Sequence, residues 1–408
     1  MGMLRLFNSL GKKMEEFHPI DKKEVVNIFT CGPSVYQRVH IGNFRTFLFE
    51  DVLVRYLEYS GYRVQRGMTI TDVEDKAIEE AAKKRNGLYR LAEENIRRFL
   101  RDAKLLRIKV PDFLPRASES VEEAVDLIES LLRKKVAYWH EDNVYFDPLK
   151  FPGFGKLYGL DMSRWPSKKR RFHKDTYPGM RWNLGDFILW HGYKDGEKYY
   201  WDTKIGRGRP AWNIQDPAMV SRYFDEPLSA YCGGIDNLVR HHDYTCAVLE
   251  SVRPYPAAKF WLHCRHLLVE GKKMSKSKGN IHYTDTLLKK GYNAEEVRFF
   301  LIYGRYRRRL NFSDTALKSA AGKLGRFRKY VKEIKARAVA GRTVPCDVSR
   351  RLHSVFIEKM DEDLDVKSAF DAMQDVLCRV KAEELKPGEA VHVLKTLREI
   401  DKVLQVVF

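Results

Sequence analysis

The fold is decided by residues 25–70, which read VVNIFTCGPSVYQRVHIGNFRTFLFEDVLVRYLEYSGYRVQRGMTI. Val25 to Cys31 is a short, mostly apolar and β-branched run that leads into Gly32-Pro33-Ser34, the pattern of a buried strand followed by a loop. Apolar side chains then recur at helical spacing from Phe44 to Ser60, and Tyr62 to Ile70 has the composition of a second strand. This order predicts a parallel βαβ unit whose ligand site lies beyond the carboxyl ends of its strands.

Between roughly Leu114 and Arg207 the pattern becomes irregular and rich in Trp, Tyr, Gly and charged residues. We interpret this segment as an insertion between the two halves of a nucleotide-binding sheet. It contains the basic run Ser167 to Lys174, in which Lys and Arg stand beside Phe and His. Such a run suits contacts with phosphates and bases, and a solvated loop explains it equally well.

The last quarter of the chain is predicted to be helical. Asn293 and Glu296 form a capping-box start to a helix over Ala294–Tyr303. Further amphipathic segments are expected at Ala316–Val339, Val348–Met360, Val366–Lys381 and Gly388–Val407. We therefore expect an α/β unit over residues 1–312, with the insertion at about 114–207, and a helical bundle over residues 313–408.

Composition narrows the class of partner and the compartment. The 408 residues include 74 Lys and Arg against 55 Asp and Glu, which gives a net charge of +19 and favours a polyanionic partner, nucleic acid first. Six cysteines without regular spacing indicate reduced thiols in a cytoplasmic protein. No apolar run approaches the ~18 residues of a membrane span, so no membrane partner is expected.

Two short motifs carry candidate chemistry. His40, Gly42 and Asn43 lie between the first strand and its helix, where backbone N–H groups and the helix dipole favour phosphate. Lys273 and Lys276, in the string KMSKSKGN over residues 273–280, suit a loop that clamps a polyphosphate. An ordinary turn and a basic solvated loop are the alternatives for each motif taken alone.

Together these motifs resemble a known family. His40-Ile41-Gly42-Asn43 followed far downstream by Lys273 to Ser277 resembles the paired signature of class I aminoacyl-tRNA synthetases, and Cys31 to Tyr36 with Ile70 to Lys76 resembles cysteinyl-tRNA synthetase. The resemblance covers nearly the whole chain, and it extends to Met3–Asp21, Gly208–Trp212, Gly233–Asp236, His241-His242 and Met360–Asp363. It implies a Rossmann-like parallel-sheet catalytic domain with an inserted subdomain, followed by an α-helical bundle.

The resemblance also implies an activity and a set of site residues. It implies a ligase that uses ATP and Mg²⁺ to form an aminoacyl-adenylate and passes the acyl group to tRNA. Contacts with phosphate and pyrophosphate fall on His40, Asn43, Lys273 and Lys276, and Gly32, with Gly42, belongs to the nucleotide site. Gly32, Thr71 and Trp212 match positions that surround the amino acid in this family.

The family grips the thiolate of cysteine with zinc, because a soft metal–sulfur bond separates cysteine from serine better than pocket contacts can. The four family ligands (Cys, Cys, His and Glu) fall on Cys31, Asp216, His241 and Thr245, so that only the first and third match. The departures gather where the amino-acid side chain should lie, whereas the ATP-handling motifs match.

Two explanations of the altered pocket stay open. In one, Cys31, His241 and Asp216 form a rebuilt zinc site with Cys232 or His242 as a fourth ligand. In the other, which the loss of two ligands together favours slightly, the metal is gone and Asp216 with Thr245 recognises a polar or cationic side chain. Buried, inert thiols are the third interpretation of the two cysteines.

Alternatives to tRNA charging follow from the same residues. The family usually continues past the helical bundle into a small domain that helps read the anticodon, whereas this sequence ends at Phe408, so anticodon reading is expected to differ. A mycothiol-ligase-like enzyme would join the amino acid to an amine, and an idle paralogue would bind tRNA without turnover. The basic charge argues against the first, and the intact motifs argue against the second.

Overall fold

A computed structural model of the chain describes residues 2–20, 25–85, 87–164, 185–275, 278–338 and 343–408. Its centre is a parallel sheet with the strand order β11-β10-β3-β4. The strands are β3 (Val25–Thr30), β4 (Arg63–Met68), β10 (Leu228–Gly234) and β11 (Ala258–Cys264). Helix α1 (Ile41–Tyr59) connects β3 to β4, which pair in parallel. The predicted βαβ unit is confirmed.

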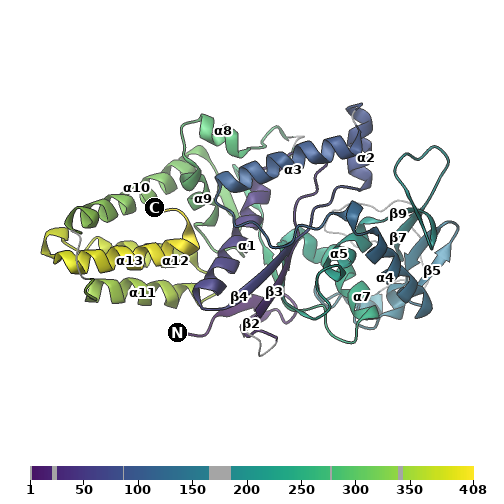
Figure 1. Cartoon of the computed structure of the whole chain (residues 1–408), viewed down its shortest axis with the longest axis horizontal. Helices are drawn as coiled ribbons and strands as arrows, with labels where there is room; N and C mark the ends of the chain where they lie inside the picture. Colours follow the sequence, from purple (N-terminus) through teal and green to yellow (C-terminus); the bar gives the residue numbers. More distant parts are fainter. Residues whose placement is uncertain (1, 21–24, 86, 165–184, 276–277, 339–342) are drawn as a thin grey trace.

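Helix α1 is buried on several sides because it packs against the sheet and also against α9 (Ala294–Ile302) and α13 (Pro387–Leu404) (Figure 1). A polar side chain in such a helix needs partners, since an unpaired buried charge is costly. The Arg45 guanidinium, 3% exposed, donates to four backbone carbonyls, among them those of Leu301 at 3.0 Å and Arg308 at 2.7 Å. Arg45 thereby fixes α1 against the segment that follows α9.

The second half of the sheet is built from α5 (Trp212–Ser221), β10, α7 (Asp243–Val252) and β11. Between the halves lies the predicted insertion, which contains a five-stranded antiparallel sheet in the order β5-β6-β7-β9-β8. Its elements are α4 (Val121–Arg133), β5 (Ala137–His140), β6 (Asn143–Phe146), β7 (Phe187–Gly192), β8 (Trp201–Thr203) and β9 (Gly206–Pro210). The last strand thus continues three residues past the predicted end, and the basic run 167–174 lies outside the described residues.

Two further groups of elements flank the sheet. Helices α2 (Asp75–Lys83) and α3 (Leu88–Leu105) follow β4. A three-stranded sheet follows β11, and it consists of β12 (Leu267–Val269), β13 (Lys272–Lys273) and β14 (Leu310–Phe312). Helix α8 (Thr284–Lys289) and helix α9 (Ala294–Ile302) lie between β13 and β14. The predicted capping box of α9 is confirmed, because the Asn293 and Glu296 side chains each accept the other's backbone N–H at 2.8 and 2.9 Å.

The four helices expected after Thr315 are present and lie together at one end of the molecule (Figure 1). They are α10 (Asp314–Arg337), α11 (Asp347–Met360), α12 (Val366–Leu377) and α13 (Pro387–Leu404). The last one ends at Leu404, three residues short of the predicted end, because Gln405 adopts a left-handed conformation with φ 58°. None of the helices that the structure describes is long and apolar enough to cross a membrane.

The helical end is tied to the parallel sheet by buried polar contacts. Arg298 on α9 and Asp51 on α1 are both fully buried and form an ion pair at 2.6 Å, and Arg298 also donates to the carbonyl of Leu404 at 2.7 Å. The N-terminal hairpin, β1 (Arg5–Asn8) with β2 (Lys13–Glu16), reaches the same end, where the backbone N–H of Phe7 donates to Asp363 at 2.9 Å. Removing one member of a buried pair costs about 3–5 kcal/mol, so these contacts hold the two parts together.

Candidate active site

A cavity of about 270 Å³ opens beyond the carboxyl ends of β3 and β10, where a parallel sheet is expected to bind its ligand. Its lining includes the predicted nucleotide-site residues Gly32, His40, Gly42, Asn43 and Lys273. The structure therefore brings these residues together around one space. Lys276 lies outside the described residues.

His40 forms the N-cap of α1, and its geometry fixes which ring nitrogen carries the proton. Nδ1 accepts the backbone N–H of Asn43 at 3.3 Å, while Oδ1 of Asn43 accepts the backbone N–H of His40 at 3.2 Å. Burial lowers the pKa of His40 to about 4, so the ring is neutral near pH 7. A neutral ring that accepts at Nδ1 carries its proton on Nε2, which leaves Nε2 able to donate to a ligand at the helix N-terminus.

A side chain at Gly32 would clash with the backbone, and one at Gly42 would press against the ring of His40. A Cβ on Gly42 would lie 3.0 Å from the ring of His40. A Cβ on Gly32 would lie 1.8 Å from the carbonyl oxygen of Thr69, because the loop after β3 packs directly on the end of β4. Both glycines therefore allow the loop and the histidine to keep their positions at the edge of the cavity.

Lys273 reaches the cavity from β13, the short strand at its rim, and is exposed. Asn280 closes the loop that follows, because its Oδ1 accepts the backbone N–H of Ser275 at 2.9 Å and its Nδ2 donates to the carbonyl of Lys273 at 3.3 Å. These two hydrogen bonds join the ends of the loop and hold the backbone of Lys273 at the rim of the cavity.

Cys31 lines the same cavity and also belongs to a buried polar cluster beneath it. Its Sγ lies 2.9 Å from Nε2 of His242 and 3.3 Å from Oδ2 of Asp216. The same carboxylate oxygen lies 3.1 Å from Nε2 of His241 and accepts the Tyr231 hydroxyl at 3.0 Å. Ligand atoms of Cys31, His241 and His242 all lie within 4.8 Å of one another.

The charges in this cluster follow from burial and from the neighbours. Burial, and then the carboxylate of Asp216, raise the pKa of the Cys31 thiol well above its usual value. Burial opposes ionisation of Asp216, but His241, Cys31 and Tyr231 more than offset it and hold the pKa of this carboxyl below its usual value. Burial lowers the pKa of His242 well below its usual value. The cluster thus has a carboxylate, a thiol and a neutral imidazole at its centre.

His242 is held from behind by residues that the sequence reasoning did not find. Its Nδ1 lies 2.8 Å from Nε2 of His263, whose Nδ1 lies 2.7 Å from the Ser9 hydroxyl. His263 follows Trp261 by two residues on β11, and Tyr231 occupies the register position opposite Trp261. Period-two alternation along two paired parallel strands is the signal that indicates this shared face, but it requires knowledge of which strands pair.

Two further amino-acid-site candidates from the sequence are Trp212, which lies against this cluster, and Thr71, which lies beside the loop after β3. Trp212 stacks on His241 with ring centroids 4.1 Å apart. Thr71 is buried, and its backbone exchanges hydrogen bonds with Pro33 and Val35 in the loop after β3. The chain turns sharply just before the two histidines, because Arg240 adopts a left-handed backbone conformation with φ 72°.

Of the other predicted residues, Cys232 faces away from the cluster, and Thr245 makes no hydrogen bond with it. Cys232 belongs to the hydrophobic core around α1, whereas Cys31 packs in a different core cluster with Tyr231. Successive residues of a strand point to opposite faces, so Cys232 faces away from the carboxylate that Tyr231 contacts. Thr245 on α7 is fully buried, and its hydroxyl has no hydrogen-bond partner among the described residues.

Comparison with solved structures identifies the fold. The chain superposes on Mycobacterium tuberculosis methionyl-tRNA synthetase in complex with methionyl-adenylate with a TM-score of 0.64 and 15% identity, covering 94% of this chain and 90% of that one. It superposes on an Agrobacterium radiobacter K84 LeuRS in a ternary complex with tRNA and LeuAMS with a TM-score of 0.67 and 11% identity, covering 96% and 85%. These similarities establish the class I aminoacyl-tRNA synthetase fold.

Sequence relatives identify the family within this class. Residues 16–322 match the family model of the tRNA synthetases class I (C) catalytic domain. The chain is 35% identical to the cysteine–tRNA ligase of Chlamydia muridarum, covering 99% of this chain and 88% of that protein, and 37% identical to that of Koribacter versatilis, covering 99% and 82%. The chain belongs to the cysteinyl-tRNA synthetase family.

Family membership confirms the general activity expected from the sequence. The chain is a ligase of the aminoacyl-tRNA synthetase type, which activates an amino acid with ATP and Mg²⁺ and charges tRNA.

Proposed function

We propose that the activated amino acid is cysteine and that zinc, held by Cys31, His241, His242 and Asp216, selects it. The observation that carries this proposal is the convergence of the Cys31 thiol and the two imidazoles within 4.8 Å of one another, beside the Asp216 carboxylate. One sulfur, two nitrogens and one carboxylate oxygen are donors that zinc accepts, and zinc in a catalytic site can expand to take a fifth ligand such as the substrate sulfur.

The surroundings of this donor set also fit a metal. A ligating histidine normally makes a hydrogen bond through its other ring nitrogen, and Nδ1 of His242 does so with His263. Nδ1 of His241 is buried without a partner among the described residues, which leaves this nitrogen available as a ligand. When bound, zinc would take the substrate sulfur as a thiolate, and serine would be rejected because its oxygen forms no comparable bond.

The same site supports a route for activation. An oxygen of the substrate α-carboxylate attacks the α-phosphorus of ATP, a new O–P bond forms, and the bond to pyrophosphate breaks. His40 donates from Nε2 to the phosphate as negative charge builds, and Lys273 with Lys276 stabilises the departing pyrophosphate. Asn43 holds His40 through the capping box, and Gly42 leaves room for its ring.

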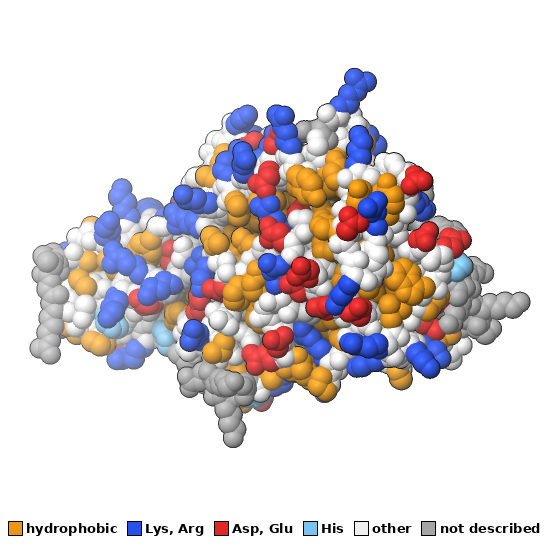
Figure 2. Space-filling model, turned by 45° about the vertical axis from the view of Figure 1, so that its right-hand side comes forward, with side chains coloured by type: hydrophobic (Ala, Val, Ile, Leu, Met, Phe, Trp, Pro, Cys, Tyr) orange, Lys and Arg blue, Asp and Glu red, His pale blue; other side chains and the backbone are white. Residues whose placement is uncertain are grey.

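The charge distribution supports tRNA as the acceptor in place of a small amine. Helix α10 carries only two acidic residues, Asp314 and Glu333. Its exposed basic side chains are Lys318, Arg326, Lys329, Lys332, Lys335 and Arg337. Lys and Arg side chains are also spread over the visible face of the helical end in Figure 2. A polyanion such as tRNA binds more tightly to such a surface, whereas the affinity for a small amine is not increased by it.

All six cysteines are free thiols, and five of them are buried. Reduced cysteines are typical of proteins in the cytosol. We accordingly place the reaction in the cytoplasm.

The decisive experiment is ATP–pyrophosphate exchange with each standard amino acid, with zinc determined on the same preparation. We expect exchange with cysteine, little with serine, about one zinc per chain, and loss of cysteine selection after chelation. Cys378→Ser, which changes an exposed thiol, should match the unmodified chain.

Exchange with a different polar or cationic amino acid, in a chain without zinc, would instead support recognition by Asp216 and Thr245. The buried hydroxyl of Thr245, which has no hydrogen-bond partner in the described part of the chain, is the observation that favours this second candidate.

A further inference from the structure

A buried ion-pair network lies in the loop that leads into α1. Arg38 stands in this loop, two residues before His40, and lines the nucleotide cavity. Its side chain is only 18% exposed. Nη2 of Arg38 pairs with Asp102 on α3 at 3.1 Å, and Nη1 donates to Asp285 on α8 at 3.0 Å. One side chain therefore joins the start of α1 to two helices that are far apart in the sequence.

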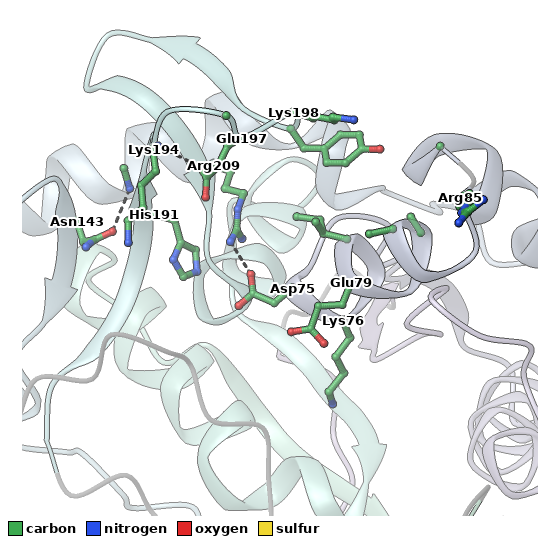
Figure 3. A pocket seen from close by; sticks show the side chains of 17 residues that line it. Asp75, Lys76, Glu79, Arg85, Asn143, His191, Lys194, Glu197, Lys198 and Arg209 are labelled. Atoms are coloured by element: carbon green, nitrogen blue, oxygen red, sulfur yellow. Dashed lines mark hydrogen bonds and ion pairs between the residues drawn. The ribbon is translucent and has the colours of Figure 1, made fainter.

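The partner on α3 is a fixed anchor. The Asp102 side chain is 1% exposed and pairs with Arg101 at 2.9 Å as well as with Arg38. The other end of α3 is also held, because the backbone N–H of Leu88 donates to the Tyr199 hydroxyl at 3.0 Å. Tyr199 lines a second cavity, of about 1060 Å³, that lies between α2 and the insertion (Figure 3). Helix α3 is thus held at both ends, and Arg38 is attached to it.

The partner on α8 belongs to the segment over residues 278–285, which comprises the start of this helix and the residues before it. Arg38 contacts this segment a second time, because its guanidinium carbon lies 4.5 Å from the ring centroid of Tyr283. A backbone hydrogen bond adds to these contacts: the N–H of Ile41, the first residue of α1, donates to the carbonyl of His282 at 3.0 Å. The segment is therefore fixed against the N-terminus of α1.

The same segment holds Lys273. Nδ2 of Asn280 donates to the carbonyl of Lys273 at 3.3 Å, and Oδ1 of Asn280 accepts the backbone N–H of Ser275 at 2.9 Å. Asn280 stands only two residues before His282. A shift of the segment would therefore move Lys273 relative to His40, and both of these residues line the nucleotide cavity.

The charge of Arg38 is compensated by its two carboxylate partners. Burial opposes the charged form, but the hydrogen bonds with Asp285 and Asp102 more than offset it and raise the pKa of Arg38 above its usual value. The hydrogen bond with Arg38 in turn lowers the pKa of Asp285. A guanidinium that already binds two carboxylates is a poor ligand for a phosphate, so this arrangement suits the fixing of neighbouring elements better than the binding of ATP.

We propose that Arg38 is a positioning residue for amino-acid activation, which holds Lys273 within reach of the phosphates that His40 contacts. Negative charge builds on the departing pyrophosphate, so a misplaced Lys273 would stabilise the transition state less while ATP still binds. A misplacement of about 1 Å can slow such a reaction by about 10²-fold. This inference rests on the role proposed above for Lys273, and it does not depend on which amino acid is activated.

The test is a double-mutant cycle between Arg38→Gln and Lys273→Ala, with ATP–pyrophosphate exchange as the measurement. We expect Arg38→Gln to lower the kcat of exchange about tenfold and to leave the KM for ATP within about twofold. When Lys273→Ala is already in place, adding Arg38→Gln should lower kcat by less than about twofold, because Arg38 acts through Lys273.

A second variant and a control separate positioning from loss of folding. Asp285→Asn breaks the same contact at a side chain that is 38% exposed, so it should reproduce the loss of kcat while the midpoint of denaturant unfolding stays unchanged. The matched control is Arg90→Gln, which removes the exposed ion pair with Glu94 on α3 at a position that does not line the nucleotide cavity. This control should keep exchange at the level of the unmodified chain.

Additive losses in the cycle would overturn the proposal, because Arg38 would then act on the reaction independently of Lys273. A raised KM for ATP with unchanged kcat in Arg38→Gln would overturn it as well, by making Arg38 a ligand of ATP. Full exchange in Lys273→Ala would instead contradict the role proposed for Lys273 itself, and the positioning role of Arg38 would fail with it.

Discussion

The two ends of the proposed active site, the nucleotide end and the amino-acid end, differ in how they are built and in how closely they follow the family. At the nucleotide end, His40, Gly42 and Asn43 come from four consecutive residues, match the family motif and line an open cavity. At the amino-acid end, Cys31 and His242 lie 211 residues apart, and two of the four ligand positions differ from the family pattern. A locally encoded cap tolerates little change, whereas a cluster that converges from distant elements can be rebuilt with other donors.

The largest effect should come from the nucleotide end. His40→Ala should lower the rate of ATP–pyrophosphate exchange about 10²–10³-fold, because it removes a donor aimed at developing charge. Zinc content should not change, since His40 lies outside the buried cluster. The control is His18→Ala at an exposed position. A fall of less than about threefold would exclude His40 from phosphate stabilisation.

The next largest effect should come from the amino-acid end, and it should leave the binding of ATP unchanged. Cys31→Ser should abolish stoichiometric zinc and raise the KM for cysteine about 100-fold, with the KM for ATP within about twofold, because a direct ligand matters at least as much as its outer partners. Steady-state exchange and metal analysis measure both. Equal changes in the two KM values would contradict the division of the site into two ends.

A smaller effect should follow from the residue behind the cluster. His263→Gln should weaken zinc binding about tenfold, because His242 loses the partner that fixes its ring. Competition with a chelator measures this affinity. His353→Gln, at an exposed position in α11, is the control and should have no effect. Unchanged zinc affinity in His263→Gln would remove His242 from the ligand set.

The smallest effect concerns acid stability at the nucleotide end. Burial lowers the pKa of His40 from 6.5 to about 4, so below pH 6.5 the unfolded chain binds a proton that the folded chain does not. Stability should therefore fall as the pH decreases, with a contribution from His40 of about 0.8 kcal/mol between pH 7.5 and pH 6. His40→Asn should be less sensitive to pH by this amount in denaturant unfolding, and an identical pH dependence would contradict the assignment.

Much of the fold could be predicted because its signals are local. The strand over Val25–Thr30, the helix that starts beside His40, the capping box of α9 and the C-terminal helices all follow from apolar spacing and capping residues that lie close together in sequence. The family motifs added the class of fold, since two short strings at a fixed order rarely occur together by chance. The predicted helix ends were less accurate, because tertiary contacts decide where a helix stops.

The sequence by itself determined the βαβ core and the nucleotide end, since a strand, a loop and a helix N-terminus that are contiguous in the chain must also be contiguous in space. Only the tertiary structure decided the amino-acid end. It brought His242 into contact with Cys31 and His263 into contact with His242. It also directed Cys232 to the opposite face of the sheet. It also opened the large cavity between α2 and the insertion. These features depend on which strands pair and on how distant elements pack, and no local pattern of residues specifies either.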